Sequence, residues 1–144
     1  MSNPAELSLN VDQHTTTRAL EWLEALAAEN HWPARTLFKM RLCLDETLTN
    51  IIMYGYPEGE PVDGSPCVRL RLHDDGQRLT LNIMDNGVAF DPTAKAPRDL
   101  DATLDDARIG GHGLRLMLHY LEDMHYARRD GWNQLQLVAT LDAP

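Results

Sequence analysis

The chain has 144 residues, of which 43% are hydrophobic and 24% are charged, and this composition is typical of a soluble globular protein. Its 13 basic and 22 acidic residues leave a net charge of −9, which opposes non-specific attraction to nucleic acid or to an anionic membrane. No apolar run is long enough to cross a bilayer, and the N-terminal residues lack an apolar signal segment. We therefore expect a single cytoplasmic domain over residues 1–144.

The N-terminal part of the chain predicts one strand and two helices. Apolar and polar residues alternate from Glu6 to Val11, which is the pattern of a half-buried strand. Asp12, Thr15 and Thr16 are cap candidates for a helix, because apolar residues at helical spacing follow them. Pro33 suits the first turn of a second helix, which we expect to run from about Ala34 to Tyr54.

The middle of the chain predicts a loop, a hairpin and a second, longer loop. Three Pro and three Gly between Gly55 and Pro66 indicate a surface loop. Residues 67–85 form two alternating runs joined at "DDGQ", which predicts an antiparallel hairpin. Its core face should carry Val68, Leu70, Leu72, Leu79, Leu81 and Ile83. The polar segment from Asn86 to Gly110 is too long for a passive connection and is typical of a lid.

The C-terminal part predicts a helix and a second hairpin. Residues 110–124 have apolar residues at helical spacing, and residues 125–142 contain two strands that turn at "RDGWN". The helix should bury Leu114, Met117, Leu118 and Leu121. Paired strands with helices between them predict an α+β fold, a two-layer sandwich in which helices cover one face of a mixed, mostly antiparallel sheet.

Two cysteines, Cys43 and Cys67, lie in the predicted helix and hairpin. Neither has a second cysteine or a histidine at metal-ligand spacing, so we expect reduced core residues rather than a metal site.

The second helix carries a polar pair in an otherwise apolar sequence. The stripe that should face the sheet contains Leu37, Met40, Leu44, Leu48 and Ile51. Glu46 and Asn50 lie one turn apart on nearly the opposite side, on a face that we expect also to hold Lys39, Leu42, Cys43 and Met53. So apolar a face suggests the wall of a cleft, although an exposed i,i+4 pair is an alternative.

Asp85, Asn86 and Gly87 follow the first hairpin. Turn chemistry alone accounts for this tripeptide. A functional interpretation is that the Asp85 carboxylate accepts a hydrogen bond from an amino group while Gly87, lacking a Cβ, lets a flat ring approach. An adenine would meet both conditions.

Three glycines in "RIGGHGL", residues 108–114, immediately precede the third predicted helix. Such a segment directs backbone N–H groups and the positive end of the helix dipole outward, which favours phosphate binding. The alternative is that Gly110 and Gly111 merely end the long loop. The usual phosphate-loop and dinucleotide glycine motifs are both absent from the sequence.

The motifs E-x-x-x-N, D-x-G and G-G-x-G-L, in this order, resemble those of the GHKL (histidine-kinase-like) superfamily of ATP-binding domains. Within it, "LDETLTNIIMYGYP" and "DLDATLDDARIGGHGL" are most similar to the anti-sigma-factor serine/threonine kinases of the RsbW type, over about residues 6–142. The resemblance implies the Bergerat ATP-binding fold, with ATP and Mg²⁺ as cofactors.

The resemblance also implies roles for individual residues. Asn50 would donate its carboxamide oxygen to Mg²⁺, and Glu46 would be the general base. Asp85 would bind the adenine amino group, with Gly87 beneath the ring. The cofactor-binding residues of the lid, at about residues 88–113, and of the helix after it would be Gly110 as a hinge, Gly111, His112, Gly113 and Leu114. Arg115 could touch a phosphate or lie at the surface.

The function that the resemblance implies is an ATP-dependent serine/threonine kinase and anti-sigma-type regulator. Its partners would be a STAS-domain antagonist, which it phosphorylates, and a sigma factor or another regulatory protein. A homodimer through the first strand and helix is compatible with the resemblance. Two alternatives stay open, namely a nucleotide-gated binding switch without kinase activity and a detached histidine-kinase catalytic domain.

Overall fold

The computed structural model describes residues 4–94 and 117–141. Its elements are β1 (Ala5–Asn10), α1 (Thr15–Glu29), α2 (Ala34–Tyr54), β2 (Cys67–Asp74), β3 (Arg78–Asp85), a short 3₁₀ helix η1 (Pro92–Ala94), β4 (Asp123–Arg129) and β5 (Trp132–Thr140). Residues 117–120 are also helical. The predicted first strand, two helices and two hairpins are thus confirmed.

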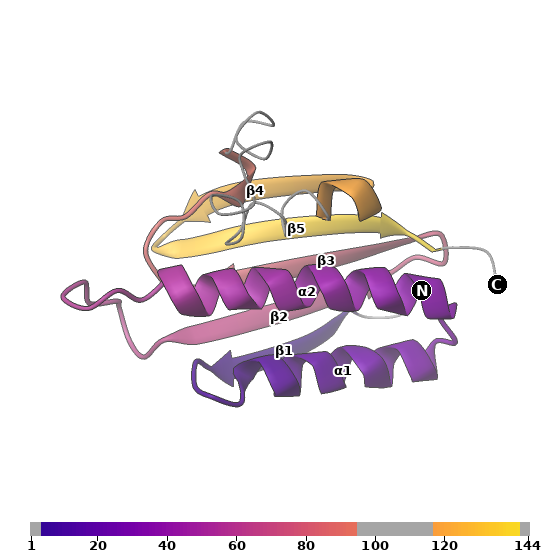
Figure 1. The fold of residues 1–144 in the computed structure, drawn as a ribbon, viewed down its shortest axis with the longest axis horizontal. Helices are drawn as coiled ribbons and strands as arrows, with labels where there is room; N and C mark the ends of the chain where they lie inside the picture. The colour runs from indigo at the N-terminus through magenta and orange to yellow at the C-terminus, as the bar shows by residue number, and fades with distance from the viewer. Residues whose placement is uncertain (1–3, 95–116, 142–144) are drawn as a thin grey trace, which may run out of the picture.

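The strands form one five-stranded sheet in the order β1-β2-β3-β5-β4. Both α1 and α2 lie on the same face of this sheet (Figure 1). The predicted α+β two-layer sandwich is therefore confirmed. The sheet is antiparallel at every pairing in the described part of the chain, so the expected mixed character is not observed. The reason is that each hairpin pairs with itself and the two hairpins then meet through β3 and β5.

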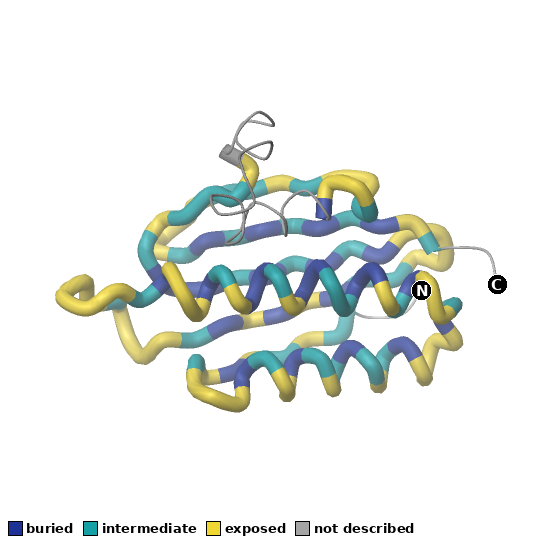
Figure 2. The backbone as a smooth tube through the Cα atoms, viewed as in Figure 1, coloured by how far each residue is buried: buried dark blue, intermediate teal, exposed yellow. Residues whose placement is uncertain are grey.

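Inward and outward side chains alternate along the strands, and the inward ones form the core. The six predicted inward side chains of β2 and β3 are all buried, and Figure 2 shows the alternation along the tube. Leu135, Leu137 and Ala139 continue the same inward surface on β5. By the same alternation two polar side chains also point inward, Asp85 at the end of β3 and Asn133 near the start of β5. These two residues lie opposite each other in the register of the two strands. The apolar surface of the sheet therefore ends in a polar pair.

The buried face of α2 is wider than predicted. Met40, Leu44, Leu48 and Ile51 are buried as expected, and Leu37 is partly buried. Lys39 and Cys43, however, are only 5% and 0% exposed, so they do not belong to an open face with Glu46. The physical reason is that α2 packs against more than the sheet, since α1 flanks it on one side and the hydroxyl of Thr47 contacts the sulfur of Met117 on the other.

The third predicted helix is confirmed only in part. Residues 117–120 are helical, but the chain enters β4 at Asp123, so Met124 lies in a strand. Met117 is buried, whereas Leu118 is 51% exposed and does not contribute to the core as expected. Leu114 lies outside the described residues.

Asn86 fastens the loop after α2 to the sheet. Its Oδ1 atom accepts hydrogen bonds from the Tyr56 hydroxyl (2.7 Å) and the Cys67 backbone N–H (2.9 Å), and its Nδ2 atom donates to the Ser65 carbonyl (2.8 Å). The residue is only 6% exposed, so these groups have little access to water. In this structure Asn86 is therefore an anchor for the loop rather than a simple turn residue.

We predict that Asn86→Ala lowers the free energy of unfolding by about 1–3 kcal/mol, because it leaves buried donors without an acceptor. Asn82→Ala, an asparagine on β3, the strand that precedes Asn86, is the matched control, since the half-buried Asn82 side chain accepts a long hydrogen bond from Gln136 (3.3 Å). It should cost about 0.5 kcal/mol or less. Urea unfolding of both variants measures the difference, and equal losses would show that Asn86 is not an anchor.

Candidate functional site

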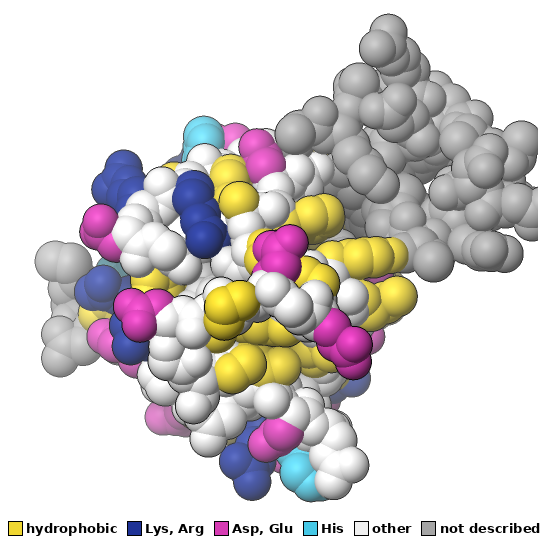
Figure 3. Space-filling model, turned by 90° about the vertical axis from the view of Figure 1, so that its left-hand side faces the viewer, with side chains coloured by type: hydrophobic (Ala, Val, Ile, Leu, Met, Phe, Trp, Pro, Cys, Tyr) yellow, Lys and Arg dark blue, Asp and Glu magenta, His cyan; other side chains and the backbone are white. Residues whose placement is uncertain are grey.

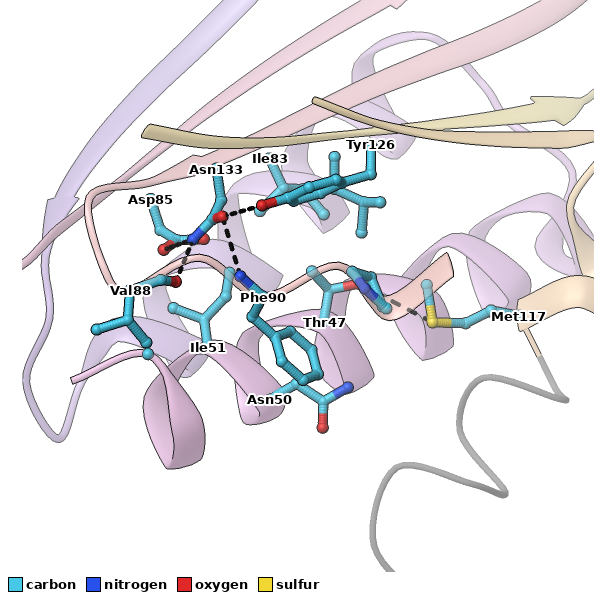
Figure 4. Close-up of a pocket in the computed structure, with 13 residues that line it drawn as sticks. Thr47, Asn50, Ile51, Ile83, Asp85, Val88, Phe90, Met117, Tyr126 and Asn133 are labelled. Atoms are coloured by element: carbon cyan, nitrogen blue, oxygen red, sulfur yellow. Dashed lines mark hydrogen bonds between the residues drawn. The ribbon is translucent and has the colours of Figure 1, made fainter. Parts of the chain in front are cut away.

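A pocket opens between α2 and the inward face of β3, β5 and β4 (Figure 4). It has a volume of about 680 Å³ including the part open to solvent, which is within the usual range for small-molecule sites. Two of the predicted site residues line it, Asn50 from α2 and Asp85 from β3. Its other lining residues are Thr47, Ile51, Gly55, Ile83, Val88, Phe90, Pro92, Met117, Tyr126, Asn133 and Leu135.

Asp85 is a buried carboxylate at the base of this pocket. It is 5% exposed, and its Oδ1 atom accepts hydrogen bonds from the Gly87 backbone N–H and from Asn133 Nδ2, both at 2.9 Å. Burial raises the pKa of Asp85, while Asn133, the Gly87 N–H and the charge of Arg128 act in the opposite direction. Among the described residues both bonds end on Oδ1, which leaves Oδ2 for a ligand in the pocket.

Asn133 connects Asp85 to the segment that follows β3. Besides its bond to Asp85, its Nδ2 atom donates to the Val88 carbonyl at 2.8 Å. Its Oδ1 atom accepts from the Tyr126 hydroxyl and from the Phe90 backbone N–H. Figure 4 shows these four bonds meeting at one side chain. Asn133 thus holds β3, β4 and residues 88–90 together at the pocket wall.

Gly87 has a structural requirement in addition to the role predicted for it. A Cβ atom at this position would lie 2.5 Å from the carbonyl oxygen of Gly55, at the end of α2. The next residue, Val88, donates its N–H to that same carbonyl at 2.8 Å, and Arg128 donates to the Gly87 carbonyl at 2.7 Å. Gly87 is therefore needed for the close approach of two backbones, and it is not among the residues that line the pocket.

Glu46 and Asn50 are both half-buried on α2. Burial raises the pKa of Glu46, a hydrogen bond from the Asn50 side chain lowers it, and the charge of Asp45 raises it. A raised pKa suits a carboxylate that must accept a proton near neutral pH. Only Asn50 of the pair lines the pocket, so Glu46 lies beside the cavity rather than in its wall.

The remaining predicted site residues, Gly110, Gly111, His112, Gly113 and Leu114, lie outside the described residues, as does Arg115. Several lining residues were not predicted, above all Asn133. The signal for it was present, because an asparagine in the phase of Leu135 and Leu137 must point inward, as Asp85 does after Ile83. Tyr126 and Phe90 gave no comparable signal, since both are ordinary apolar residues in the sequence.

Three further features of the described residues concern metal ligands, cysteines and membrane-spanning helices. Within residues 4–94 and 117–141, no group of three His, Cys, Asp or Glu side chains could hold a metal ion alone. Cys43 and Cys67 are both free, and burial raises the pKa of Cys43 to about 12. In the same ranges, no helix has the length and apolarity that crossing a bilayer requires.

Exposed apolar side chains lie next to the site. Figure 3, which looks at the end of the molecule where α2 finishes, shows hydrophobic side chains gathered on this surface. Ile52, Met53 and Tyr54 are 38%, 54% and 37% exposed at the C-terminal end of α2. The Tyr54 ring stacks on Phe90, which lines the pocket. The apolar surface is therefore continuous with the pocket wall.

Comparison with known proteins gives one family. A family model described as the histidine kinase-like ATPase domain matches residues 9–139. The serine/threonine-protein kinase BtrW of Bordetella bronchiseptica is 44% identical over 133 residues, which cover 92% of this chain and 91% of the relative. The serine-protein kinase RsbW of Bacillus pumilus is 25% identical over 113 residues, with coverage of 76% and 68%.

Solved structures show the same fold. The RsbU and RsbW domains of a Mycobacterium tuberculosis protein match with a TM-score of 0.66 at 16% identity, over 99% of this chain and 34% of that one. The histidine kinase domain of a blue-light activated kinase of Erythrobacter litoralis matches with a TM-score of 0.53 at 20% identity, over 76% of this chain and 46% of that one. This chain therefore spans less than half of the length of either solved chain.

We predict that Asp85→Asn stabilises the protein relative to wild type as the pH rises. Because burial raises the folded-state pKa of Asp85 above its ordinary value of 3.8, its contribution to stability is fully present below that value. It is lost as the pH rises through the folded-state pKa. The substituted carboxamide does not titrate but keeps an acceptor for Gly87 and Asn133, so the stability of the variant relative to wild type should increase as the pH rises above the ordinary pKa of 3.8.

Asp75→Asn is a control of opposite sign. Asp75 is exposed in the first hairpin, and hydrogen bonds from the backbone N–H groups of Arg78 and Gln77 lower its pKa. The contribution of Asp75 to stability is present above its ordinary pKa and is lost as the pH falls. The stability of Asp75→Asn relative to wild type should therefore decrease as the pH rises. Urea unfolding across the pH range measures both, and identical pH profiles for Asp85→Asn and wild type would contradict the prediction.

Proposed function

The chain belongs to the family of histidine kinase-like ATPase domains, and we propose that it transfers the γ-phosphate of ATP to a serine or threonine of a STAS-domain antagonist in a partner switch. The observation that carries this proposal is the pocket in which Asp85 and Asn50 face the same cavity, with Glu46 one turn from Asn50. The names of the two curated relatives, both protein kinases, support the reaction class.

The base of ATP is proposed to bind at Asp85. An adenine amino group is a hydrogen-bond donor, and Asp85 Oδ2 is the matching acceptor at the base of a pocket with apolar walls. Ile51, Ile83 and Val88 supply apolar surface on which a flat ring can pack. This arrangement supports recognition of a nucleotide rather than of a phosphate group alone.

Phosphoryl transfer is proposed to take place beside α2. The hydroxyl oxygen of the substrate forms a bond to the γ-phosphorus, the bond to the bridging oxygen breaks, and ADP leaves. Glu46 accepts the proton that the hydroxyl releases, and its raised pKa favours this role. The segment with Gly110, Gly111, His112, Gly113 and Leu114 is proposed to bind the phosphates, as the family resemblance implies.

Asn50 fits a magnesium ion in its donor chemistry. Its carboxamide oxygen is a hard ligand on the pocket wall, and Mg²⁺ takes few protein ligands when phosphates and water complete its shell. When bound, the ion would neutralise charge on the phosphates. Glu46, which shares a hydrogen bond with Asn50, would hold the orientation of that side chain.

A protein substrate is supported by the apolar surface at the end of α2. Ile52, Met53 and Tyr54 are exposed close to Asn50 in the sequence, and an exposed apolar patch of this kind is typical of a contact site for another protein. We propose that the antagonist docks here, with a sigma factor as a further partner and a homodimer through β1 and α1. A cytoplasmic location accompanies this proposal, because the free cysteines suit a reducing compartment.

We predict that Glu46→Gln and Asp85→Asn separate catalysis from nucleotide binding. With labelled ATP, Mg²⁺ and the candidate antagonist, wild type should yield phosphoserine or phosphothreonine. Glu46→Gln should keep its affinity for ATP while transfer falls by about 10²–10⁴-fold, which is the usual contribution of a general base. Asp85→Asn should lose ATP affinity itself, because it presents a donor to the amino group of the base.

Asp45→Asn is the control for charge. Asp45 precedes Glu46 on α2 but is exposed, so removing its charge should leave transfer within about twofold of wild type. ATP binding without any label transfer by wild type would reject the kinase in favour of a nucleotide-gated switch. Transfer of the label to a histidine would favour the histidine-kinase alternative.

A further inference from the structure

Asn133 is the most fully bonded polar side chain of the pocket, and no motif in the sequence pointed to it. It is 4% exposed and lies opposite Asp85 in the register of β3 and β5. All four groups that it bonds belong to the site, namely the Asp85 carboxylate, the Val88 carbonyl, the Phe90 N–H and the Tyr126 hydroxyl. A residue of this kind can control how the site presents Asp85 to a ligand.

The amide of Asn133 has one orientation that satisfies its backbone neighbours. The Val88 carbonyl is only an acceptor and must face the NH₂ group, whereas the Phe90 N–H is only a donor and must face the oxygen. This fixes the NH₂ group toward Asp85 Oδ1. The Tyr126 hydroxyl, which can donate or accept, donates to the amide oxygen in this orientation. Asn133 therefore always offers Asp85 a donor.

A donor at Oδ1 determines what the rest of the carboxyl group can do. Hydrogen bonds from Asn133 and the Gly87 N–H favour the ionised form of Asp85, against the burial that raises its pKa. With Oδ1 so occupied, Oδ2 is the oxygen of this pocket-lining carboxylate that stays available as an acceptor among the described residues. Without Asn133 the buried carboxyl group would take up a proton more readily and could rotate.

We propose that Asn133 is the positioning residue that makes Asp85 selective for a purine with an amino group at C6, as in adenine. The inference rests on the proposed nucleotide function and deepens it. Adenine carries a donor amino group where hypoxanthine carries a carbonyl acceptor. An ionised, fixed Asp85 accepts from the former and repels the latter. A protonated Asp85 could donate to the carbonyl, so loss of Asn133 removes the discrimination and not only the affinity.

The test is the ratio of the dissociation constants for ITP and ATP, measured by calorimetry with Mg²⁺. In Asn133→Ala this ratio should fall by about tenfold, mostly through weaker ATP binding, because one hydrogen bond to a charged group is lost. Tyr126→Phe keeps Asn133 and removes only the hydroxyl that bonds the amide oxygen. Tyr126→Phe should also lower the ratio, by a smaller factor than Asn133→Ala. It provides the test if Asn133→Ala does not fold.

Gln136→Ala is the matched control, because this amide lies on the same strand but bonds Asn82 instead of the pocket. Its ratio should equal that of wild type. If Asn133→Ala weakens the binding of ATP and of ITP by the same factor, Asn133 has only a structural role. That result would overturn this inference but not the proposed function. Wild type that binds ATP and ITP equally would also overturn it, whereas wild type that binds neither nucleotide would overturn the proposed function as well.

Discussion

The site depends on a buried carboxylate at the end of an apolar row. Asp85 follows Leu79, Leu81 and Ile83 on the inward face of β3, where burial disfavours its charge. The cost is offset locally, because the neighbouring strand places Asn133 directly opposite and the chain turns so that the Gly87 N–H points back. A carboxylate held this way is pre-organised for a donor, which is what recognition of a base requires.

A second constraint is the contact between the ends of two elements. The Gly55 carbonyl at the end of α2 accepts the N–H of Val88, and Gly87 passes within a distance that no Cβ would allow. The helix that carries Glu46 and Asn50 is thereby fixed to the strand that carries Asp85. The two halves of the proposed site, one for the base and one for the phosphoryl group, are therefore held at a set separation by backbone contacts rather than by flexible side chains.

Sequence patterns predicted the elements well because the patterns are local. Alternation located the inward residues of β2 and β3, and Pro33 and Gly55 marked the limits of α2. The burial of Lys39 and Cys43 was not predictable from helical periodicity, because it depends on what packs beside α2. The close approach of Gly87 to Gly55 was likewise not predictable, since nothing in the sequence shows that the two residues lie together.

The inward direction of Asn133 was predictable from the sequence, but its hydrogen-bond partners were not. Its inward phase on β5 could have been read from the sequence, but its meaning depends on the register that pairs it with Asp85, 48 residues away in the chain. The same side chain holds the Val88 carbonyl and the Phe90 N–H. Any shift of residues 88–90 must therefore alter a hydrogen bond of Asn133, the side chain that donates to Asp85. The proposed base recognition and the position of the segment after β3 are therefore coupled through one side chain.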